Sequence, residues 1–547
     1  MTSRQAAAWP AGCVLALTSL VNAPCAVAAG EEALAEARAA AESGDSESSL
    51  ALYDQRLAVQ PDDVEALNRS AQQLSWEHRF DEALARYERV LTLQPDNHFA
   101  LLERAKVLSW ARRYEESIAA FERLLELGPE DLEARLGYAR VLSWAGRLGA
   151  ARTQYLAILD EQPGHGYALL GVAQTYAWSG DLRQGRRYYR LAADALDDPK
   201  DAEVGLAYID LWEGASGRAL AKAEDLDSRH GGDGDVDDLL RAARDATAPW
   251  IASSWDRMTD SDDHRVSTWR TEAGFWLPLG VAARLTYADY DIHSQEQRGS
   301  IRSMQARLNW VPLAEHRVEL MLGADSWSRP AQASDSTVDW GFNYSFPVRG
   351  TWSAFVGAWR EPYRYSVPLI DNRIVINAYS TGASGRLPGD WRLATQVGVW
   401  QTSDDNRRLS ADLSARRPWR LGTHSLEAGG NLRWLDWRTE AGNGYFDPSN
   451  FTAIGAPLRA FGPISKAHSI NYDVSVELGL QSYDFAGTRT SLDPYYITVA
   501  RISQQVTPSL RLEAFAEAGS YASEGSNDWR YSRGGARFVW QFGRTGE

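Results

Sequence analysis

Cysteine, lysine and long apolar runs are scarce in this 547-residue chain, and each scarcity excludes a class of protein. The only cysteines are Cys13 and Cys25, so we expect neither a disulfide framework nor a thiolate metal site in the chain beyond them. No apolar run reaches about 18 residues, which excludes a helical membrane protein. The formal net charge is -16, and lysine occurs only at Lys106, Lys200, Lys222 and Lys466. An acidic chain without a basic stripe argues against nucleic acid as a partner.

Residues 1–29 are typical of a secretory signal peptide. Arg4 supplies a positive start, Val14 to Val21 form a short apolar core, and the small residues 26–29 suit a cleavage site. Lipidation at Cys25 is the alternative, but Pro24 before it fits that rule poorly. The pattern predicts export from the cytoplasm.

Four interleaved series of residues recur every 34 positions after this segment. They are Trp76, Trp110, Trp144, Trp178 and Trp212; Pro61, Pro95, Pro129 and Pro163; Tyr53, Tyr87, Phe121, Tyr155 and Tyr189; and Ala66, Ala100, Ala134, Ala168 and Ala202. The period and the residue types resemble the tetratricopeptide repeat (TPR), a helix–turn–helix unit. The resemblance implies an all-α solenoid over residues 30–224, with about five recognisable units and degenerate units at both ends.

The five repeat tryptophans are the candidate partner-binding residues of this solenoid. Each ends the first helix of its unit in phrases such as Leu142-Ser143-Trp144. Two interpretations stay open. The tryptophans pack at the turn between helices, or they form an aromatic row that stacks on sugar rings.

Residues 225–249 change character and are expected to be a linker. The segment His230 to Asp235 is rich in glycine and aspartate, and residues 236–243 have room for one or two helical turns. We place the domain boundary near Pro249.

From Trp250 onward the apolar pattern switches to a period of two, which is typical of strands. Examples are Arg317 to Leu322, Asp473 to Leu480 and Ser509 to Ala514. The segments are about 10–14 residues long, enough for tilted strands that cross a membrane. Tryptophans near segment ends suit the membrane interfaces; they are Trp269, Trp276, Trp310, Trp327, Trp340 and Trp352. Residues 250–547 are therefore predicted to form an outer-membrane β-barrel, and a soluble sandwich is the alternative.

The barrel is expected to have about sixteen strands, with fourteen as the alternative. An even number returns both ends of the barrel to the same side, which suits a repeat domain in the periplasm. The last strand, Arg537 to Phe542, resembles the C-terminal targeting signal of outer-membrane proteins, although residues 543–547 follow it.

The barrel contributes almost none of the net charge. Residues 251–547 hold 32 acidic and 31 basic residues, which leaves 41 acidic and 26 basic residues for the first 250. Inward candidates that would line the lumen are Asp473, Glu477, Arg511, Glu513 and Glu517. A nearly neutral lumen suits a neutral or zwitterionic polymer. The acidity of the repeats either attracts a cationic partner or serves ordinary solubility.

Repeats joined to a C-terminal barrel resemble the outer-membrane proteins of bacterial exopolysaccharide export. The plan is that of two families, the outer-membrane component of cellulose synthase and the poly-N-acetylglucosamine export porin. The phrase Leu142 to Arg147 is similar to repeats beside YaiO-type barrels, and Gly444 to Phe451 is similar to a segment of the barrel in the cellulose family. The resemblance implies that the repeats receive the polymer, or its synthase subunits and periplasmic enzymes, and that the barrel is the exit conduit through outer-membrane lipid.

No catalytic constellation, phosphate-binding loop or histidine pair with metal-ligand spacing is present, so we expect neither an enzyme nor a cofactor. The pair Asp404-Asp405 lies between strands and is interpreted as a solvated turn. Two other functions stay open. The barrel could anchor a TPR scaffold for protein assembly, or its outer loops could make it a surface receptor.

Overall fold

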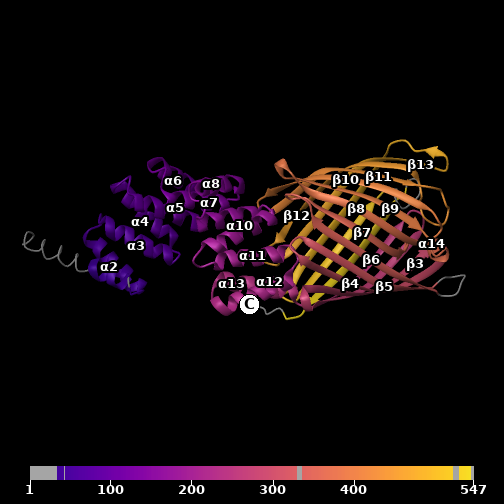
Figure 1. Ribbon diagram of the computed structural model, residues 1–547, viewed down its shortest axis with the longest axis horizontal. Helices are drawn as coiled ribbons and strands as arrows, with labels where there is room; N and C mark the ends of the chain where they lie inside the picture. The colour runs from indigo at the N-terminus through magenta and orange to yellow at the C-terminus, as the bar shows by residue number, and fades with distance from the viewer. Residues whose placement is uncertain (1–33, 42, 329–334, 521–528, 544–547) are drawn as a thin grey trace, which may run out of the picture. The chain divides into compact units, whose positions relative to one another are not determined.

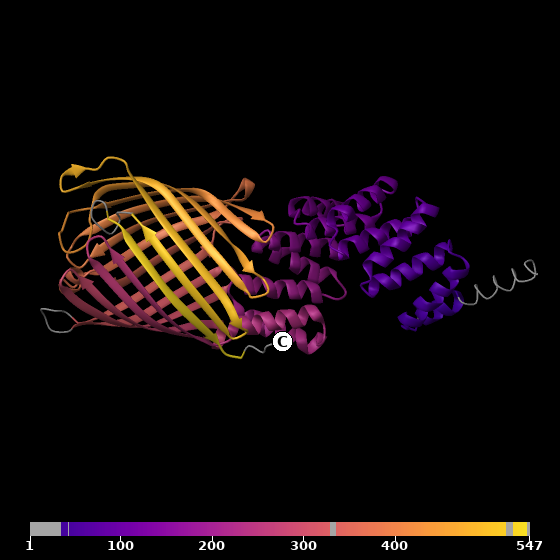
Figure 2. The same ribbon diagram turned by 180° about the vertical axis from the view of Figure 1, so that it is seen from behind.

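The computed structural model describes residues 34–41, 43–328, 335–520 and 529–543. The signal peptide and both cysteines lie outside these residues, so their interpretation stays a prediction. The chain divides into two compact units, residues 1–202 and 203–547. The first is wholly helical where it is described, and the second joins three helices to a large sheet (Figures 1 and 2).

Paired antiparallel helices form the first unit. Helical residues 34–41 precede nine further helices. These are α2 (Ser46–Val59), α3 (Val64–Trp76), α4 (Phe80–Leu93), α5 (His98–Trp110), α6 (Tyr114–Leu127), α7 (Leu132–Trp144), α8 (Leu148–Glu161), α9 (Gly166–Trp178) and α10 (Leu182–Ala195). Each odd-numbered helix from α3 begins after a capping side chain, at Asp63, Asn97, Asp131 and His165. These caps keep the 34-residue period, so one local signal starts the first helix of each unit.

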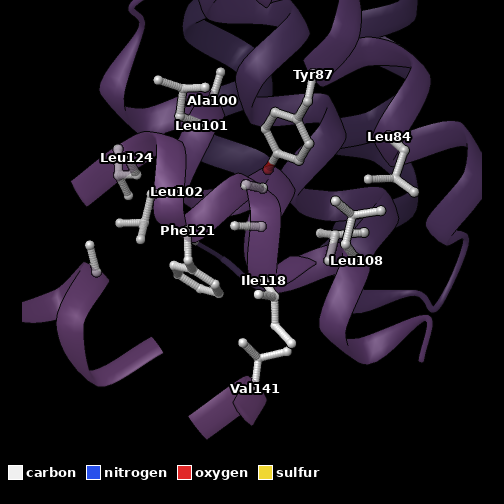
Figure 3. Packing of buried hydrophobic residues seen from close by; sticks show 14 of the residues in the cluster. Leu84, Tyr87, Ala100, Leu101, Leu102, Leu108, Ile118, Phe121, Leu124 and Val141 are labelled. Carbon is white, nitrogen blue, oxygen red and sulfur yellow. The ribbon is translucent and has the colours of Figure 1, made fainter. Parts of the chain in front are cut away.

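Small and aromatic residues alternate in the core of this unit. Tyr87 and Phe121 are buried, and their rings point into the space between neighbouring helices (Figure 3). The alanines of the repeat, such as Ala100, are fully buried and let the helices approach closely. The aromatic residues and the alanines that recur every 34 positions therefore form the core of a TPR solenoid.

Three helices begin the second unit, and they correct the expected linker. They are α11 (Lys200–Trp212), α12 (Ser216–His230) and α13 (Gly234–Thr247). Residues 225–249 are thus mostly helical. Asp233 caps α13, and Val236 and Leu239 are buried against Leu226 of α12. The glycines and aspartates of this segment suggested a linker, although its apolar residues recur at helical spacing.

The sheet of the second unit is a closed antiparallel barrel of sixteen strands, which confirms the predicted fold class. Strand β1 pairs with both β2 and β17, and this pairing closes the sheet. The strands are β1 (Trp250–Asp260), β2 (His264–Leu277), β3 (Val281–Ser294), β4 (Gln297–Leu313), β5 (His316–Ser328), β6 (Asp335–Pro347), β7 (Ser353–Pro362), β8 (Val375–Leu387), β9 (Trp391–Thr402), β10 (Arg407–Leu421), β11 (His424–Trp437), β12 (Ser449–Ser465), β13 (Ile470–Phe485), β15 (Asp493–Thr507), β16 (Leu510–Gly519) and β17 (Tyr531–Gln541). The two-residue β14 (Thr488–Arg489) only extends one loop.

The two ends of the barrel differ. At the end where β1 begins and β17 finishes, here called the terminal end, short turns join the strands; two of them are the 3-10 turns η1 (Pro278–Gly280) and η2 (Pro388–Asp390). The opposite end, here called the loop end, has longer connections. One of them, residues 363–374, contains the short helix α14 (Val367–Asp371), which lies at the end of the barrel opposite α12 (Figure 1).

The two faces of the wall differ in chemistry. Exposed apolar side chains alternate along the strands with polar ones, as in Leu478 beside the buried Glu477. The strand register keeps each set on one face around the closed sheet, and the exposed set includes Leu285, Leu320, Leu322, Val338, Phe342, Val397, Leu413, Ile454, Leu478, Leu512 and Phe538. An apolar outside and a polar inside are typical of an outer-membrane barrel.

The expected aromatic girdle is only partly correct. Trp269, Trp310 and Trp340 are exposed on the apolar face, but Trp327 is buried on the inner face beside Val367 of α14. Trp276 also departs from the girdle, because its indole Nε1 donates to the carbonyl of Ala246, 3.2 Å away. Among the described residues, none of the helices is both long and apolar enough to cross a membrane.

Candidate functional site

The repeat tryptophans end their helices but are not buried in the turns. Trp76, Trp110, Trp144, Trp178 and Trp212 are the last residues of α3, α5, α7, α9 and α11 and are exposed by 57, 41, 40, 44 and 49%. A tryptophan that served only to pack the turn would be mostly buried. The exposure therefore favours the second interpretation, an aromatic row available to a ligand.

Three of these tryptophans line one groove in the first unit. The groove has a volume of about 390 Å³ and includes Trp76, Trp110 and Trp144. Gln72, Lys106 and Arg140 also line it, each four residues before one of these tryptophans and so one helical turn away. An aromatic face beside a hydrogen-bonding side chain thus repeats from helix to helix.

The groove holds a charged bridge between two repeats. Lys106 Nζ lies 2.7 Å from Glu103 Oε1 and 2.6 Å from Glu133 Oε1. Burial alone would lower the pKa of Lys106, but the hydrogen bonds to both carboxylates outweigh it and raise the pKa above its ordinary value. Lys106 therefore keeps its charge at neutral pH and links α5 to α7.

Gly137 lines the floor of the groove, and Gly171 takes the same position one repeat later. A Cβ at Gly137 would lie 2.5 Å from two ring carbons of Phe121, and one at Gly171 would lie 2.3 Å from the Tyr155 ring. These aromatic rings of the second helices fill the space that a side chain would need. The two glycines fall 34 residues apart, and this spacing is the signal that could have identified them from the sequence.

The five lumen candidates lie on the polar face of the barrel wall, and each has a partner. Asp473 is paired with Arg459 at 2.8 Å, and Arg511 with Glu513 at 2.9 Å. Glu517 accepts from the hydroxyl of Tyr531 at 2.8 Å. Their role as the lining of a conduit remains a proposal.

Glu477 is the most enclosed of the five candidates. Arg433 donates to both of its oxygens, at 2.7 and 3.0 Å, and Tyr495 donates at 2.6 Å. Asn431 adds a fourth bond at 2.7 Å. These partners come from β11 and β15, so Glu477 of β13 ties several strands together.

The loop of residues 363–374 enters the barrel at the loop end. The hydroxyl of Tyr365 donates to Asp260 at the end of β1, and the backbone N–H of Val367 donates to Ser294 of β3. Arg364 donates to Asp325 of β5 and Asp339 of β6, at 2.7 and 2.8 Å. A short segment can reach strands this far around the wall only from the inside.

A second loop, residues 438–448, joins the first. Ser366 Oγ donates to the carbonyl of Gly444, and the two loops share an apolar cluster that contains Leu369, Tyr445 and Phe446. We call the two segments together the loop plug. The alternation of the strands did not predict it, although eleven to twelve residues are more than a hairpin needs.

No group of three or more His, Cys, Asp or Glu side chains in the described part of the chain is placed to hold a metal ion. Asp404, expected in a solvated turn, instead accepts from Tyr445 and Asn443, both at 2.8 Å.

Comparisons with known proteins agree with this architecture. Residues 111–164 match the family model of the tetratricopeptide repeat. No curated protein matches the chain. A tetratricopeptide repeat protein from Parabacteroides merdae ATCC 43184 is 17% identical, with a TM-score of 0.38, over 41% of this chain and 88% of its own.

Two solved barrels are also similar. A structure described as a bacterial polysaccharide outer membrane secretin is 12% identical, with a TM-score of 0.44, over 54% of this chain and 99% of its own. CdiB from Acinetobacter baumannii is 12% identical, with a TM-score of 0.38, over 54% of this chain and 60% of its own. Similarity at this level concerns the fold alone. The family match over residues 111–164 and the strand pairing describe a protein that combines TPR repeats with a closed sixteen-strand barrel, apolar outside and polar inside.

Proposed function

We propose that this protein exports an exopolysaccharide through the outer membrane. The observation that carries the proposal is the pairing of a closed barrel, polar inside and apolar outside, with a repeat domain that exposes a row of tryptophans. Sixteen strands give a barrel wide enough for an aqueous lumen. The terminal end of the barrel would face the periplasm, where the repeats meet the polymer.

The tryptophan groove supplies the polymer contact. Successive first helices pack side by side, so neighbouring tryptophans recur at roughly 8–10 Å, the usual distance between packed helices. Flat indole faces at that interval suit the apolar faces of sugar rings in an extended chain. Gln72, Lys106 and Arg140 provide hydrogen bonds to hydroxyl groups beside each ring. The same groove could instead hold a segment of a synthase subunit or a periplasmic enzyme.

Inside the barrel, the terminal half is accessible to water. Arg392 and Arg501 are exposed by 52 and 57% although they lie on the inner face. The loop plug occupies the other half, so export requires the plug to move. No step in this role breaks or forms a covalent bond.

The loop plug favours a second candidate function, in which the barrel only anchors a TPR scaffold in the outer membrane. In that case the plug is permanent and the groove recruits periplasmic proteins. The two functions differ in what the lumen must do, so one experiment separates them.

The test is a deletion of the gene in its host, complemented by the wild type or by a variant that lacks residues 363–374. Export predicts that the deletion leaves polymer in the periplasm and that both complementing genes restore polymer to the medium. Normal secretion by the deletion strain would exclude the export role. Failure to assemble periplasmic partners, with normal secretion, would support the scaffold.

A further inference from the structure

Arginine dominates the inner face of the barrel in its terminal half. Eleven arginines lie there, each within six residues of the terminal end of its strand: Arg284, Arg307, Arg317, Arg386, Arg392, Arg416, Arg420, Arg459, Arg501, Arg511 and Arg537. The carboxylates on the same stretch of wall are Asp256, Glu272, Glu319, Glu427, Asp473 and Glu513. We call this set the arginine ring. It has eleven positive and six negative side chains.

The carboxylates of the ring are already shared between arginines. Glu427 is paired with Arg392 at 3.0 Å and with Arg459 at 3.6 Å. Glu272 is paired with Arg537 at 2.9 Å and with Arg284 at 3.6 Å. Asp473 and Glu513 are shared in the same way. Local ion pairing therefore leaves positive charge in excess.

Three arginines of the ring stand directly opposite one another in the strand ladder. Arg386 of β8 is in register with Arg392 of β9, and Arg392 is in register with Arg416 of β10. Like charges at directly opposed positions destabilise a sheet. Three arginines in one row therefore concentrate positive charge, which a bound anion would offset.

A second such pair lies elsewhere on the ring. Arg284 of β3 is in register with Arg307 of β4. Glu319 lies 3.2 Å from Arg307, and Glu272 lies 3.6 Å from Arg284, so each of these two arginines has a single carboxylate partner. The excess is thus found on both sides of the barrel.

The loop half of the inner face carries the opposite excess. Its carboxylates include Asp260, Asp325, Asp339, Asp412, Glu477 and Glu517, and its arginines include Arg270, Arg408, Arg433 and Arg533. The lumen is close to neutral in total, as the composition predicts, but the charge is divided between its two ends. A sum over the sequence cannot show that division.

We propose that the arginine ring selects an anionic polysaccharide at the terminal end of the barrel. Guanidinium groups bind carboxylates through two parallel hydrogen bonds and give up water more readily than ammonium groups. Lysine is absent from the described strands of the barrel, which fits recognition rather than general positive charge. A polymer of uronic-acid sugars offers a carboxylate at each repeat and can move from one arginine to the next.

This inference rests on the proposed export function and names its substrate class. It replaces the neutral or zwitterionic polymer that the total lumen charge suggests. A purely structural role for the ring would predict about equal numbers of arginines and carboxylates on this stretch of wall. Contact with the adjoining helices accounts for Arg317, which donates to the carbonyl of Glu213 at 3.0 Å.

The test uses the purified full-length protein in detergent and three oligosaccharides of equal length. These are oligogalacturonate, cello-oligosaccharide and chitosan oligosaccharide, which are anionic, neutral and cationic. Calorimetry should show that oligogalacturonate binds at least about tenfold more tightly than the other two, and that rising salt weakens its binding. The triple variant R386Q/R392Q/R416Q should lose at least about tenfold in affinity for oligogalacturonate.

The matched control is Arg417→Gln. Arg417 is the next residue of β10, so its side chain lies on the opposite, apolar face of the wall. R417Q removes the same charge but should leave oligogalacturonate binding unchanged. Heat-modifiable migration on gels should show that both variants form the barrel.

The outcomes separate this inference from the export function. Equal binding of all three oligosaccharides, or tighter binding of the neutral or cationic one, would overturn anionic selection while export stands. An equal loss in R417Q and in the triple variant would also overturn it. If no oligosaccharide binds and the deletion strain secretes normally, both proposals fail.

Discussion

Arg364 Nη2 lies 2.7 Å from Asp325 Oδ2, and this pair fastens the loop plug to the wall of the barrel. Asp325 is fully buried, as is Asp339, which lies 2.8 Å from the same guanidinium. Arg364 belongs to the loop, and both aspartates belong to strands. Two buried carboxylates of the wall thus depend for their counter-charge on a residue of the loop plug.

Replacing Arg364 should release the plug. Arg364→Gln leaves buried carboxylates without their cation, a loss of about 3–5 kcal/mol. Since about 1.4 kcal/mol is a factor of ten, the ratio of open to closed plug should rise at least a hundredfold. Single-channel recording in planar bilayers should show a higher conductance, and residues 363–374 should exchange amide hydrogens faster.

The control for this prediction is Arg373→Gln in the same loop. Arg373 is paired with Asp335 at 3.1 Å, but its side chain is more than half exposed. Exposed pairs contribute little, so R373Q should conduct like the wild type. If R364Q also keeps the wild-type conductance, the plug is a fixed part of the barrel, and this result would favour the scaffold function over export.

The tryptophan groove predicts a loss of binding with only a limited loss of stability. W110A/W144A removes two partly exposed rings, so polymer binding should weaken by about tenfold. Stability should fall less than after loss of a fully buried tryptophan, because the two residues are exposed by 41 and 40%. Tryptophan fluorescence titration and thermal unfolding check the two parts. A large fall in melting temperature would instead return these residues to a packing role.

The solenoid could be predicted from the sequence because its signals are local. The same tryptophan ends every first helix, and the same aromatic residue fills the space between helices. The barrel could be predicted for a similar reason, since a period of two recurs along each strand. The alternation also constrains the strand register, because one apolar face must stay outside around a closed sheet.

What the sequence did not show depends on contacts between distant residues. Nothing near Arg364 indicates that its partners are Asp325 and Asp339 on two other strands. Trp327 lies near the end of its strand, as a girdle residue does, but the loop plug covers its side chain. Likewise, the helix α13 lies in an acidic run whose apolar residues are recognised only by what they pack against.

The floor of the groove gives a prediction of unusual sign. Glycine to alanine within a helix ordinarily stabilises by about 1 kcal/mol. At Gly137 the new Cβ would meet Phe121 at 2.5 Å, so G137A should destabilise the repeats. Gly149 of α8 has nothing within 4 Å of its Cβ position, and G149A should stabilise them. Thermal unfolding followed at 222 nm compares the two. The second substitution F121L should recover part of the loss in G137A, and no recovery would mean that the clash is not the cause.

The membrane-facing side of the wall is tested by depth. Leu478 lies near the middle of β13 and is 60% exposed, so L478R should destabilise the barrel in lipid by about 2–4 kcal/mol. Val506 lies near the terminal end of β15 and is 46% exposed, and V506R should cost only about 0–1 kcal/mol. Urea titration in lipid vesicles measures both. Equal costs at the two depths would show that this face does not meet the membrane core.

Asp63 predicts how the repeats respond to acid. Its carboxylate caps α3 by accepting from the N–H groups of Glu65 and Ala66, both at 3.1 Å, and it lies 2.7 Å from Arg56 Nε. Burial alone would raise the pKa of Asp63, but the hydrogen bonds from Ala66 and Arg56 outweigh it and hold the pKa below its ordinary value.

A carboxyl with a lowered folded-state pKa stabilises the fold fully above its unfolded pKa of about 4, and the stabilisation is lost as pH falls through the folded value. Helix stability should therefore decline below about pH 4, with a smaller slope in D63N, because that variant has no proton to bind. D63N should also lose about 1–2 kcal/mol at pH 7, since an amide caps the helix but cannot pair with Arg56. Asp62→Asn is the neighbouring control, because Asp62 is more than half exposed and lies outside the cap. Thermal unfolding at 222 nm between pH 2 and 7 compares the three proteins, and an acid slope in D63N equal to that of the wild type would assign the acid sensitivity to other carboxylates.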